Sequence, residues 1–338
     1  MAMDVTIRGA GIFGLSVAWA CAQAGAAVRV IDPAGVAAGA SGGIVGALAP
    51  HVPENWNPKK AFQLDSLLMA ERFWAEVGGA SGYARTGRLQ PLPDADAIAL
   101  ARRREGTAAQ LWGEAATWKV VREAPDWAPP SPTGAWVWDD LSAHLHPRKA
   151  CHALADALRS QGVDIVAQGA EEGAVIWATG VTGLEALNTG APRLMGQGVK
   201  GQAALLSLDK AGAPQLFADA LHIIPHLDGT VAVGATTENT FEHTQTDDRL
   251  DDVIARARVA VPTLEGAAVI ERWAGLRPRA RSRAPMLGPW PDRPGHFIAN
   301  GGFKIGFGMA PKVGAVMAAL VLEGRDEIPP GFEVAASA

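Results

Sequence analysis

Three glycines near the N-terminus have the spacing of a site that binds a dinucleotide. Gly9, Gly11 and Gly14 form a GxGxxG pattern between a strand-like segment and a segment with helical spacing. The first glycine of such a pattern permits a tight turn, the second lets the backbone approach a pyrophosphate, and the third allows close helix–strand packing. Asp32 closes the next apolar strand, where a carboxylate accepts hydrogen bonds from a ribose 2′-hydroxyl. The predicted dinucleotide contacts are therefore Gly9, Gly11, Ile12, Phe13, Gly14 and Asp32.

Two further loops are rich in glycine and other small residues. One, at Ser41, Gly42 and Gly43, follows the second strand directly, whereas a NAD dehydrogenase usually continues with regular βαβ units. The other, over 300–311, leads into an apolar helix whose positive N-terminus suits a reduced, anionic flavin ring. We therefore expect a flavin dinucleotide. The residues expected to complete its site are Val166, Ala178, Thr179, Gly180, Gly301, Gly302, Phe303, Lys304 and Ile305.

The elements that must position these loops follow an α/β pattern at both ends of the chain. A strand over 4–8, a helix over 12–24 and a strand over 27–31 form a βαβ unit with a buried parallel sheet. Further helices are expected over 62–77, 95–114, 147–162, 247–261 and 311–322, and strands over 86–92, 163–166, 174–177, 202–206, 222–224, 230–233, 269–274 and 296–299. We expect the 95–114 helix to be exposed, the tryptophan-rich segment 125–138 to be an ordered connection, and the residues beyond Pro330 to form a loose tail.

Composition and charge narrow the function classes. The chain has 338 residues, of which 48% are hydrophobic and 19% charged, which is typical of a globular protein. Thirty Lys and Arg against 35 Asp and Glu give a net charge of −5, which argues against a general nucleic-acid binder. Tyr83 is the one tyrosine, which excludes chemistry that needs several tyrosine hydroxyls.

The cysteine, histidine and hydropathy patterns indicate a cytoplasmic protein without a metal site. Cys21 and Cys151 form no CxxC and can build neither a disulfide scaffold nor a structural zinc site. The histidine pairs 144/146 and 222/226 lack a third ligand at useful spacing. The uncharged stretch 9–27 resembles a signal-peptide core, but its glycines and the strand before it favour the dinucleotide fold, so no membrane span is expected.

Several motifs together resemble one known family. Besides the glycine fingerprint and the Ser41 loop, the chain carries KGQ at 200–202, VGAT at 233–236, WAGLRP at 273–278 and PMLG at 285–288. With these stretches in order over nearly its whole length, the sequence resembles the D-amino acid oxidase family of FAD-dependent enzymes, and most of all the glycine oxidase branch. The 273–278 stretch is the most specific of the matches.

The resemblance implies an α/β fold with two interleaved domains. A Rossmann-like FAD-binding domain would comprise residues 1–78, 139–195 and 275–330. An inserted α+β substrate domain, built on a large mixed or antiparallel sheet, would comprise residues 79–138 and 196–274, with 331–338 as a tail.

The resemblance also implies a reaction. FAD, held non-covalently, would oxidise a small amino acid or amine such as glycine, a D-amino acid or an N-methyl amino acid. The α-hydrogen would leave as hydride to flavin N5, and the imine would hydrolyse to a keto acid or an aldehyde. Oxygen or another acceptor would then take the electrons. Nothing in the sequence fixes that acceptor, the stereochemical preference or the formation of a homo-oligomer.

Four residues are the expected catalytic and substrate contacts. By resemblance, Arg277 binds the substrate carboxylate, for which a planar guanidinium is well shaped. Lys304 stands where glycine oxidases have an arginine, and His222 stands where they have a tyrosine, so glycine itself is in doubt as the substrate. His51 follows a stretch that runs beside the flavin in the family, and we expect it to contact the ring or the substrate.

One charge pattern and two other functions stay open. Arg277, Arg279, Arg281 and Arg283 alternate, and they form either an electropositive entrance for a substrate with extra negative charge or a solvated surface stripe. A related tRNA wobble-uridine oxidase domain also opens with GxGxxG and a Gly-Ala-Ser-Gly loop, but the acidic balance disfavours it. The other alternative is a non-catalytic dinucleotide-binding protein.

Overall fold

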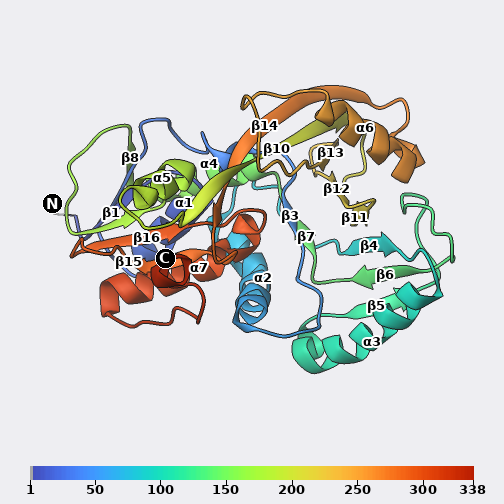
Figure 1. Ribbon diagram of the computed structural model, residues 1–338, viewed down its shortest axis with the longest axis horizontal. Coiled ribbons are helices and arrows are strands. Elements are labelled where there is room, and N and C mark those ends of the chain that lie inside the picture. The colour runs from blue at the N-terminus through green and yellow to red at the C-terminus, as the bar shows by residue number, and fades with distance from the viewer. Residues whose placement is uncertain (1–2) are drawn as a thin grey trace.

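A six-stranded, mostly parallel sheet forms one half of the molecule. The structure, a computed structural model, describes residues 3–338, and Figure 1 shows this half on the left, with both chain ends. Its strands, in spatial order, are β15 (Met286–Pro289), β16 (His296–Asn300), β9 (Ala174–Trp177), β1 (Val5–Arg8), β2 (Val28–Ile31) and β8 (Asp164–Val166). All neighbours are parallel except β15, which runs antiparallel to β16.

Helices cover both faces of this sheet, because its strands alternate apolar side chains to either side. Ile176 and Ala299 pack in one core with α1 (Ile12–Gln23), α2 (Pro58–Val77), α4 (Pro147–Ser160) and α7 (Gly306–Glu323). Their neighbours Trp177 and Ile298 pack in a second core with α5 (Gly180–Asn188). Apolar runs in short strands are typical of a sheet buried on both faces. The expected βαβ unit over 4–31 is confirmed.

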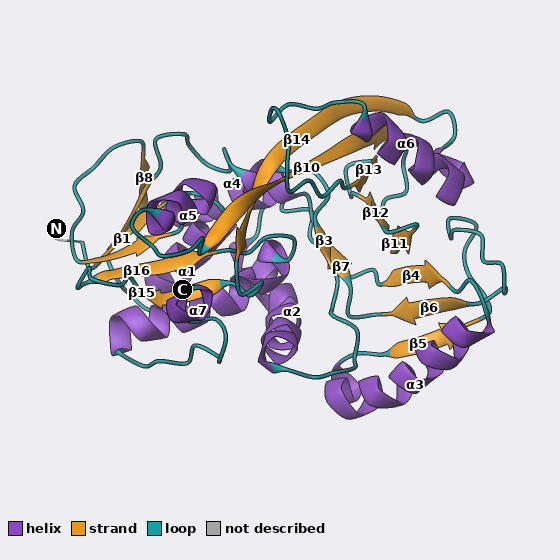
Figure 2. Ribbon diagram, viewed as in Figure 1, coloured by secondary structure: helices purple, strands orange, loops and turns teal. Residues whose placement is uncertain are grey.

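An eight-stranded mixed sheet forms the other half (Figure 2). Its strands, in spatial order, are β14 (Ala268–Ala280), β10 (Gly196–Ser207), β13 (Thr230–Gly234), β12 (Leu221–Pro225), β11 (Gln215–Ala218), β4 (Arg88–Pro91), β6 (Trp136–Asp139) and β5 (Trp118–Val121). Only β11 and β4 pair in parallel. Helix α6 (Arg249–Ala260) packs against β10, β12 and β13, and helix α3 (Ala95–Trp112) against β5. The predicted fold class is confirmed; the predicted domain boundaries stay a prediction.

The two longest strands join the halves. Figure 1 shows β10 and β14 passing from the eight-stranded sheet to the six-stranded one. Near the end of β14 the backbone N–H of Phe303 donates to the Pro278 carbonyl at 2.9 Å, and Arg279 forms an isolated bridge with Gly302. A short pair, β3 (Ala47–Leu48) with β7 (Ala143–His144), lies between the sheets. The loop over 301–305 is therefore fixed to the same strand that carries Arg277.

Several local expectations were wrong. The 95–114 helix is not exposed throughout, since Ala101, Ala108 and Trp112 are buried. Strands β5, β6, β11 and β15 were not expected, because a strand of four residues is too short to show a clear alternation. Helix α7 begins at Gly306 rather than at Pro311. Its packing on α1 and α2 extends the helix past a proline that removes only one donor.

The C-terminal residues are ordered, so the expectation of a loose tail was also wrong. The Phe332 side chain is 1% exposed and packs on Phe62 with ring centroids 4.9 Å apart. The backbone N–H of Leu287 donates to the Phe332 carbonyl at 2.8 Å. Phe332 thus anchors the C-terminal residues on α2 and β15. The segment 125–138 is ordered as expected, since Trp127 donates its indole N–H to the Pro214 carbonyl at 2.8 Å.

Among the described residues, α7 alone is long and apolar enough to cross a membrane by length and composition. It packs against α1 and α2, and 56% of its apolar window is buried inside the protein. Burial of this kind is also typical of a core helix in a globular fold. Cys21 and Cys151 are buried and free.

Candidate active site

A cavity of about 1340 Å³ runs between the two sheets. At one end it is lined by Asp32 and the fingerprint loop, and at the other by Arg277, His222 and Phe217. The lining also includes most residues that the sequence predicts as cofactor contacts: Gly9, Gly11, Ile12, Phe13, Asp32, Ser41, Gly43, Ala178, Thr179, Gly180, Gly301, Gly302, Phe303, Lys304 and Ile305. The fold therefore brings segments that are far apart in the sequence to one elongated site.

The fingerprint loop is tied in place by side chains from neighbouring elements. Ser41 accepts a hydrogen bond from the Ile12 N–H at 3.0 Å, at the N-terminus of α1. Asp32 accepts the Ala10 N–H at 2.8 Å. A Cβ at Gly14 would lie 1.9 Å from the Gly9 carbonyl oxygen, so α1 can approach β1 this closely only with glycine there. Gly11, Ile12 and Phe13 at the start of α1 line the cavity, so the positive end of this helix faces a space that could take an anionic pyrophosphate.

Three predicted cofactor residues do not line the cavity. Gly14 lies behind the loop, in the helix–strand contact. Gly42 packs on the Ala37 carbonyl, which a Cβ would approach to 2.3 Å. Val166 pairs with Ile31 at the edge of the sheet. These three residues pack behind the residues that line the cavity.

A half-buried arginine lines the cavity at the end away from the fingerprint loop. Arg277, on β14, donates from Nη1 to the Thr236 carbonyl at 3.0 Å. Within residues 3–338 it forms no ion pair within 4.0 Å. Burial lowers the pKa of Arg277 to about 10, and the charge of Glu238 works in the opposite direction. The guanidinium is therefore charged at neutral pH and has no carboxylate of the described chain to neutralise it.

A second cation and a neutral histidine accompany Arg277. Lys304 lies in the loop before α7, and burial followed by the charge of Arg277 lowers its pKa. His222, on β12, packs its ring on Phe217 with centroids 4.9 Å apart. Burial lowers the pKa of His222 to about 3, and the charges of Arg88, Lys304 and Arg277 add to the effect. The imidazole is therefore uncharged at physiological pH.

His51 does not line the cavity, contrary to its expected contact with the ring or the substrate. Its backbone N–H donates to Gln63 Oε1 at 2.7 Å, and its ring Nδ1 lies 2.5 Å from the same oxygen. Gln63 itself lines the cavity. Sequence reasoning missed Gln63, a polar residue on the buried side of α2, although a buried polar residue among apolar neighbours was a usable signal.

The alternating arginines do not form one stripe. The Arg279 guanidinium lies over the Phe303 ring at 5.5 Å. Arg281 donates to the carbonyls of Ser337 at 3.2 Å and Ala338 at 3.0 Å. Strand β14 ends at Ala280, so the alternation stops after Arg279. Of the series, only Arg277 lines the cavity.

The histidine pairs are rearranged by the fold. His226 stacks near His146 with ring centroids 4.8 Å apart and lies 6.4 Å from His144, while its Nε2 is 2.8 Å from the Ile44 carbonyl. Burial lowers the pKa values of His144 and His146 to about 4. Over the described part of the chain, no group of three or more His, Cys, Asp or Glu side chains could hold a metal ion.

Comparisons with known proteins identify the family of the chain. The family model described as DAO, FAD dependent oxidoreductase, matches residues 4–320. The glycine oxidase of Bacillus licheniformis is 24% identical over 363 residues, covering 94% of this chain and 93% of that protein. The glycine oxidase of Pseudomonas putida is 34% identical over 139 residues, which are 40% of this chain and 38% of that protein.

Solved structures show the same fold. The glycine oxidase of Geobacillus kaustophilus has a TM-score of 0.84 at 19% identity and covers 98% of both chains. The iminodiacetate oxidase of Chelativorans has a TM-score of 0.81 at 24% identity and covers 96% of this chain and 97% of that one. With the family model matching almost its whole length, the chain belongs to the DAO family of FAD-dependent oxidoreductases.

Proposed function

We propose that the protein oxidises a small amino acid or amine that carries a carboxylate group. The observation that carries this proposal is Arg277, a half-buried cation in the cavity wall with no ion-pair partner within residues 3–338. A charge in such a place is costly unless a ligand pairs with it. Relatives named glycine oxidase and iminodiacetate oxidase act, by those names, on amino carboxylates, which have the matching anion.

The residues present fit FAD. The N-terminus of α1, with Gly11 and Ser41, offers backbone donors for the pyrophosphate, and Asp32 lies where a ribose hydroxyl would reach it. At the other end the glycine loop over 301–305 and the N-terminus of α7 line the cavity. Glycines there let the backbone approach a flat ring closely, and the helix N-terminus offers it a positive partial charge. When bound, FAD supplies the two-electron acceptor for the reaction.

The protein's own part is orientation and charge. Arg277 holds the carboxylate and so fixes the position of the α-carbon, which converts the reaction into an oriented, unimolecular step. Lys304 adds a second positive charge. Two nearby cations disfavour a substrate ammonium group, so they favour the neutral amine that can release a hydride. The only acid among the described lining residues, Asp32, lies at the far end, so we expect the substrate proton to leave to water.

The test compares Arg277→Met with a matched arginine variant. Arg272→Met removes an arginine from the same strand, where its partner is the exposed Asp251 at 2.6 Å. We expect Arg277→Met to keep FAD and lose at least tenfold in kcat/KM with small amino acids, as removal of a charge-assisted contact implies. Arg272→Met should behave as the wild type. Normal kinetics of Arg277→Met would contradict the proposal.

The substrate and the electron acceptor can be identified with the same protein. Under anaerobic conditions, the flavin colour of the holoenzyme should bleach with one member of a panel of glycine, D-amino acids and N-methyl amino acids. Admitting oxygen then separates an oxidase, whose colour returns quickly, from a dehydrogenase, whose colour returns only with an added quinone or carrier. A panel in which no amino acid bleaches the flavin would refute the proposed substrate class.

A further inference from the structure

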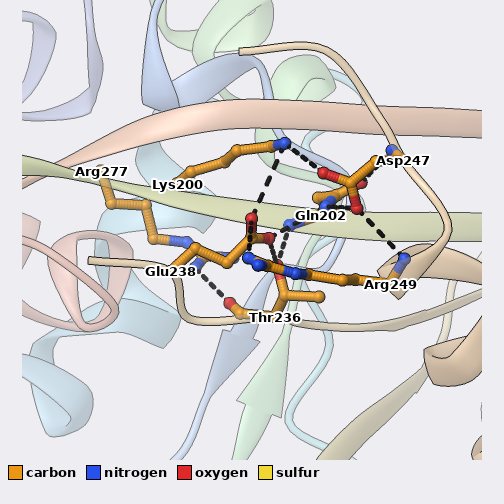
Figure 3. A network of polar contacts seen from close by, with 7 residues as sticks. All are labelled: Lys200, Gln202, Thr236, Glu238, Asp247, Arg249 and Arg277. Atoms are coloured by element: carbon orange, nitrogen blue, oxygen red, sulfur yellow. Dashed lines mark hydrogen bonds and ion pairs between the residues drawn. The ribbon is translucent and has the colours of Figure 1, made fainter. Parts of the chain in front are cut away.

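A polar network with a buried centre lies directly behind Arg277. Figure 3 shows it, with Lys200 and Gln202 from β10, Thr236 and Glu238 from the segment after β13, and Asp247 and Arg249 near the start of α6. The side chain of Lys200 is 1% exposed and that of Glu238 is 4% exposed. Lys200 Nζ donates to Asp247 Oδ2 at 2.6 Å and lies 3.7 Å from Glu238 Oε2.

Glu238 accepts hydrogen bonds from three other members of this network. Its Oε1 accepts the Thr236 hydroxyl at 2.5 Å and the Gln202 amide at 2.9 Å. Its Oε2 accepts from Arg249 Nη1 at 2.8 Å. The Thr236 hydroxyl also accepts the Gln202 backbone N–H at 2.9 Å, so its single proton points to Glu238. The carboxylate therefore determines the orientation of that hydroxyl.

The same segment presents the carbonyl that holds Arg277. Thr236 and Glu238 are tied to β10 by backbone hydrogen bonds to Gln202 and Lys200 at 2.9–3.1 Å. The Thr236 carbonyl accepts from Arg277 Nη1 at 3.0 Å, as Figure 3 shows. One guanidinium N–H group is thus fixed to the backbone, which leaves the remaining donors for a ligand.

The charges of the network leave one positive charge. Lys200, Arg249 and Arg277 are cations, and Glu238 and Asp247 are anions, giving +1 in total. Although burial works to raise the pKa of Glu238, hydrogen bonds from Thr236 and Gln202 and the charge of Lys200 lower it below its usual value. Lys200 and Glu238 at the centre are buried, whereas Arg249 is 59% exposed. Replacing a buried ion pair by apolar residues is often neutral or stabilising, so the presence of this pair calls for a role besides stability. A single substrate carboxylate would bring the net charge of the network to zero.

We propose that Glu238 is a positioning residue for substrate binding: through Thr236 it holds the carbonyl that orients Arg277, and its charge supports the guanidinium without pairing with it. The proposal rests on the proposed function, in which Arg277 binds a carboxylate. The probe is acetate, titrated into the holoenzyme and followed by the visible spectrum of the flavin. Acetate contains the carboxylate alone, so its affinity reports on Arg277 and not on the reaction.

The first test is a double-mutant cycle. Glu238→Gln should weaken acetate binding about tenfold, as expected when support for one charged hydrogen bond is lost. In an Arg277→Met background the same substitution should change nothing further, because the effect acts through the arginine. The matched control is Asp251→Asn, which removes the exposed carboxylate that pairs with Arg272 and should leave acetate affinity unchanged.

The outcomes separate the two proposals. If Arg277→Met leaves acetate affinity unchanged, the proposed function fails. If Arg277→Met weakens binding and Glu238→Gln does not, or if the two losses are additive, Glu238 has no positioning role while the proposed function stands. Should Glu238→Gln fail to fold, Thr236→Ser and Thr236→Val give the same test. The serine keeps the hydroxyl and should bind acetate normally, and the valine should lose affinity; equal affinities would overturn the proposal.

Discussion

The guanidinium of Arg277 lies across Gly201 of the neighbouring strand. A Cβ at Gly201 would come within 2.0 Å of Arg277 Nη1 and 2.1 Å of Cζ. Gly201 pairs with Gly275 across β10 and β14, two positions before Arg277 on the latter strand. The absence of a side chain on β10 therefore creates the space in which the arginine reaches the cavity.

Gly201→Ala should displace Arg277 while leaving the fold and the FAD site in place. We expect at least a tenfold loss of acetate affinity, because the charged contact depends on the position of the guanidinium. Flavin spectra during an acetate titration would measure it. Gly106→Ala is the control, since that glycine lies inside α3 with no atom within 4 Å of a new Cβ. Wild-type affinity in Gly201→Ala would show that the arginine does not need this space.

Lys304 should give acetate binding an alkaline limit. Burial and the charge of Arg277 lower its pKa, so its positive charge is lost as pH rises through a value below that of an ordinary lysine. Acetate affinity should therefore fall over that range in the wild type. In Lys304→Arg the fall in acetate affinity should move to higher pH. Lys304→Met should bind acetate more weakly than the wild type even at neutral pH. An identical fall in Lys304→Arg would assign the titration to another group.

His222 should contribute no ionisation between pH 5 and pH 8. Burial and the nearby cations lower its pKa to about 3, so the ring is neutral above that value. The pH profile of kcat/KM should have the same shape in His222→Gln as in the wild type, even where its height differs. Loss of a bell-shaped limb near neutral pH in the variant would show that the histidine titrates there.

Phe332→Ala should destabilise the protein although Phe332 lies six residues from Ala338. Truncating a buried phenylalanine costs about 3–5 kcal/mol in typical cores. A lowered urea midpoint relative to the wild type would measure the loss. The exposed Glu327→Ala should change stability by less than about 0.5 kcal/mol. Equal midpoints for the two variants would mean that the anchoring by Phe332 is unimportant.

Short-range patterns predicted the βαβ unit that lines one end of the cavity. The unit from β1 to β2 was predicted because strand, glycine turn, helix and Asp32 follow one another within 32 residues. The resemblance supplied Arg277 from a single motif. By contrast, Gln63 and the Glu238 network depend on which strands and helices become neighbours, and spacing along the chain carries no such information. The four alternating arginines do not share one face for a local reason, since β14 ends at Ala280.

The hydrogen bond between Phe303 and Pro278 has a mechanical consequence. It fastens the loop over 301–305, which lines the cavity, to the strand that carries Arg277, one residue after that arginine. The separation between this loop and Arg277 therefore depends on this backbone contact and not on the outer strands. None of the described residues that line the cavity comes from β4, β5 or β6, so substitutions in those strands should leave that separation unchanged.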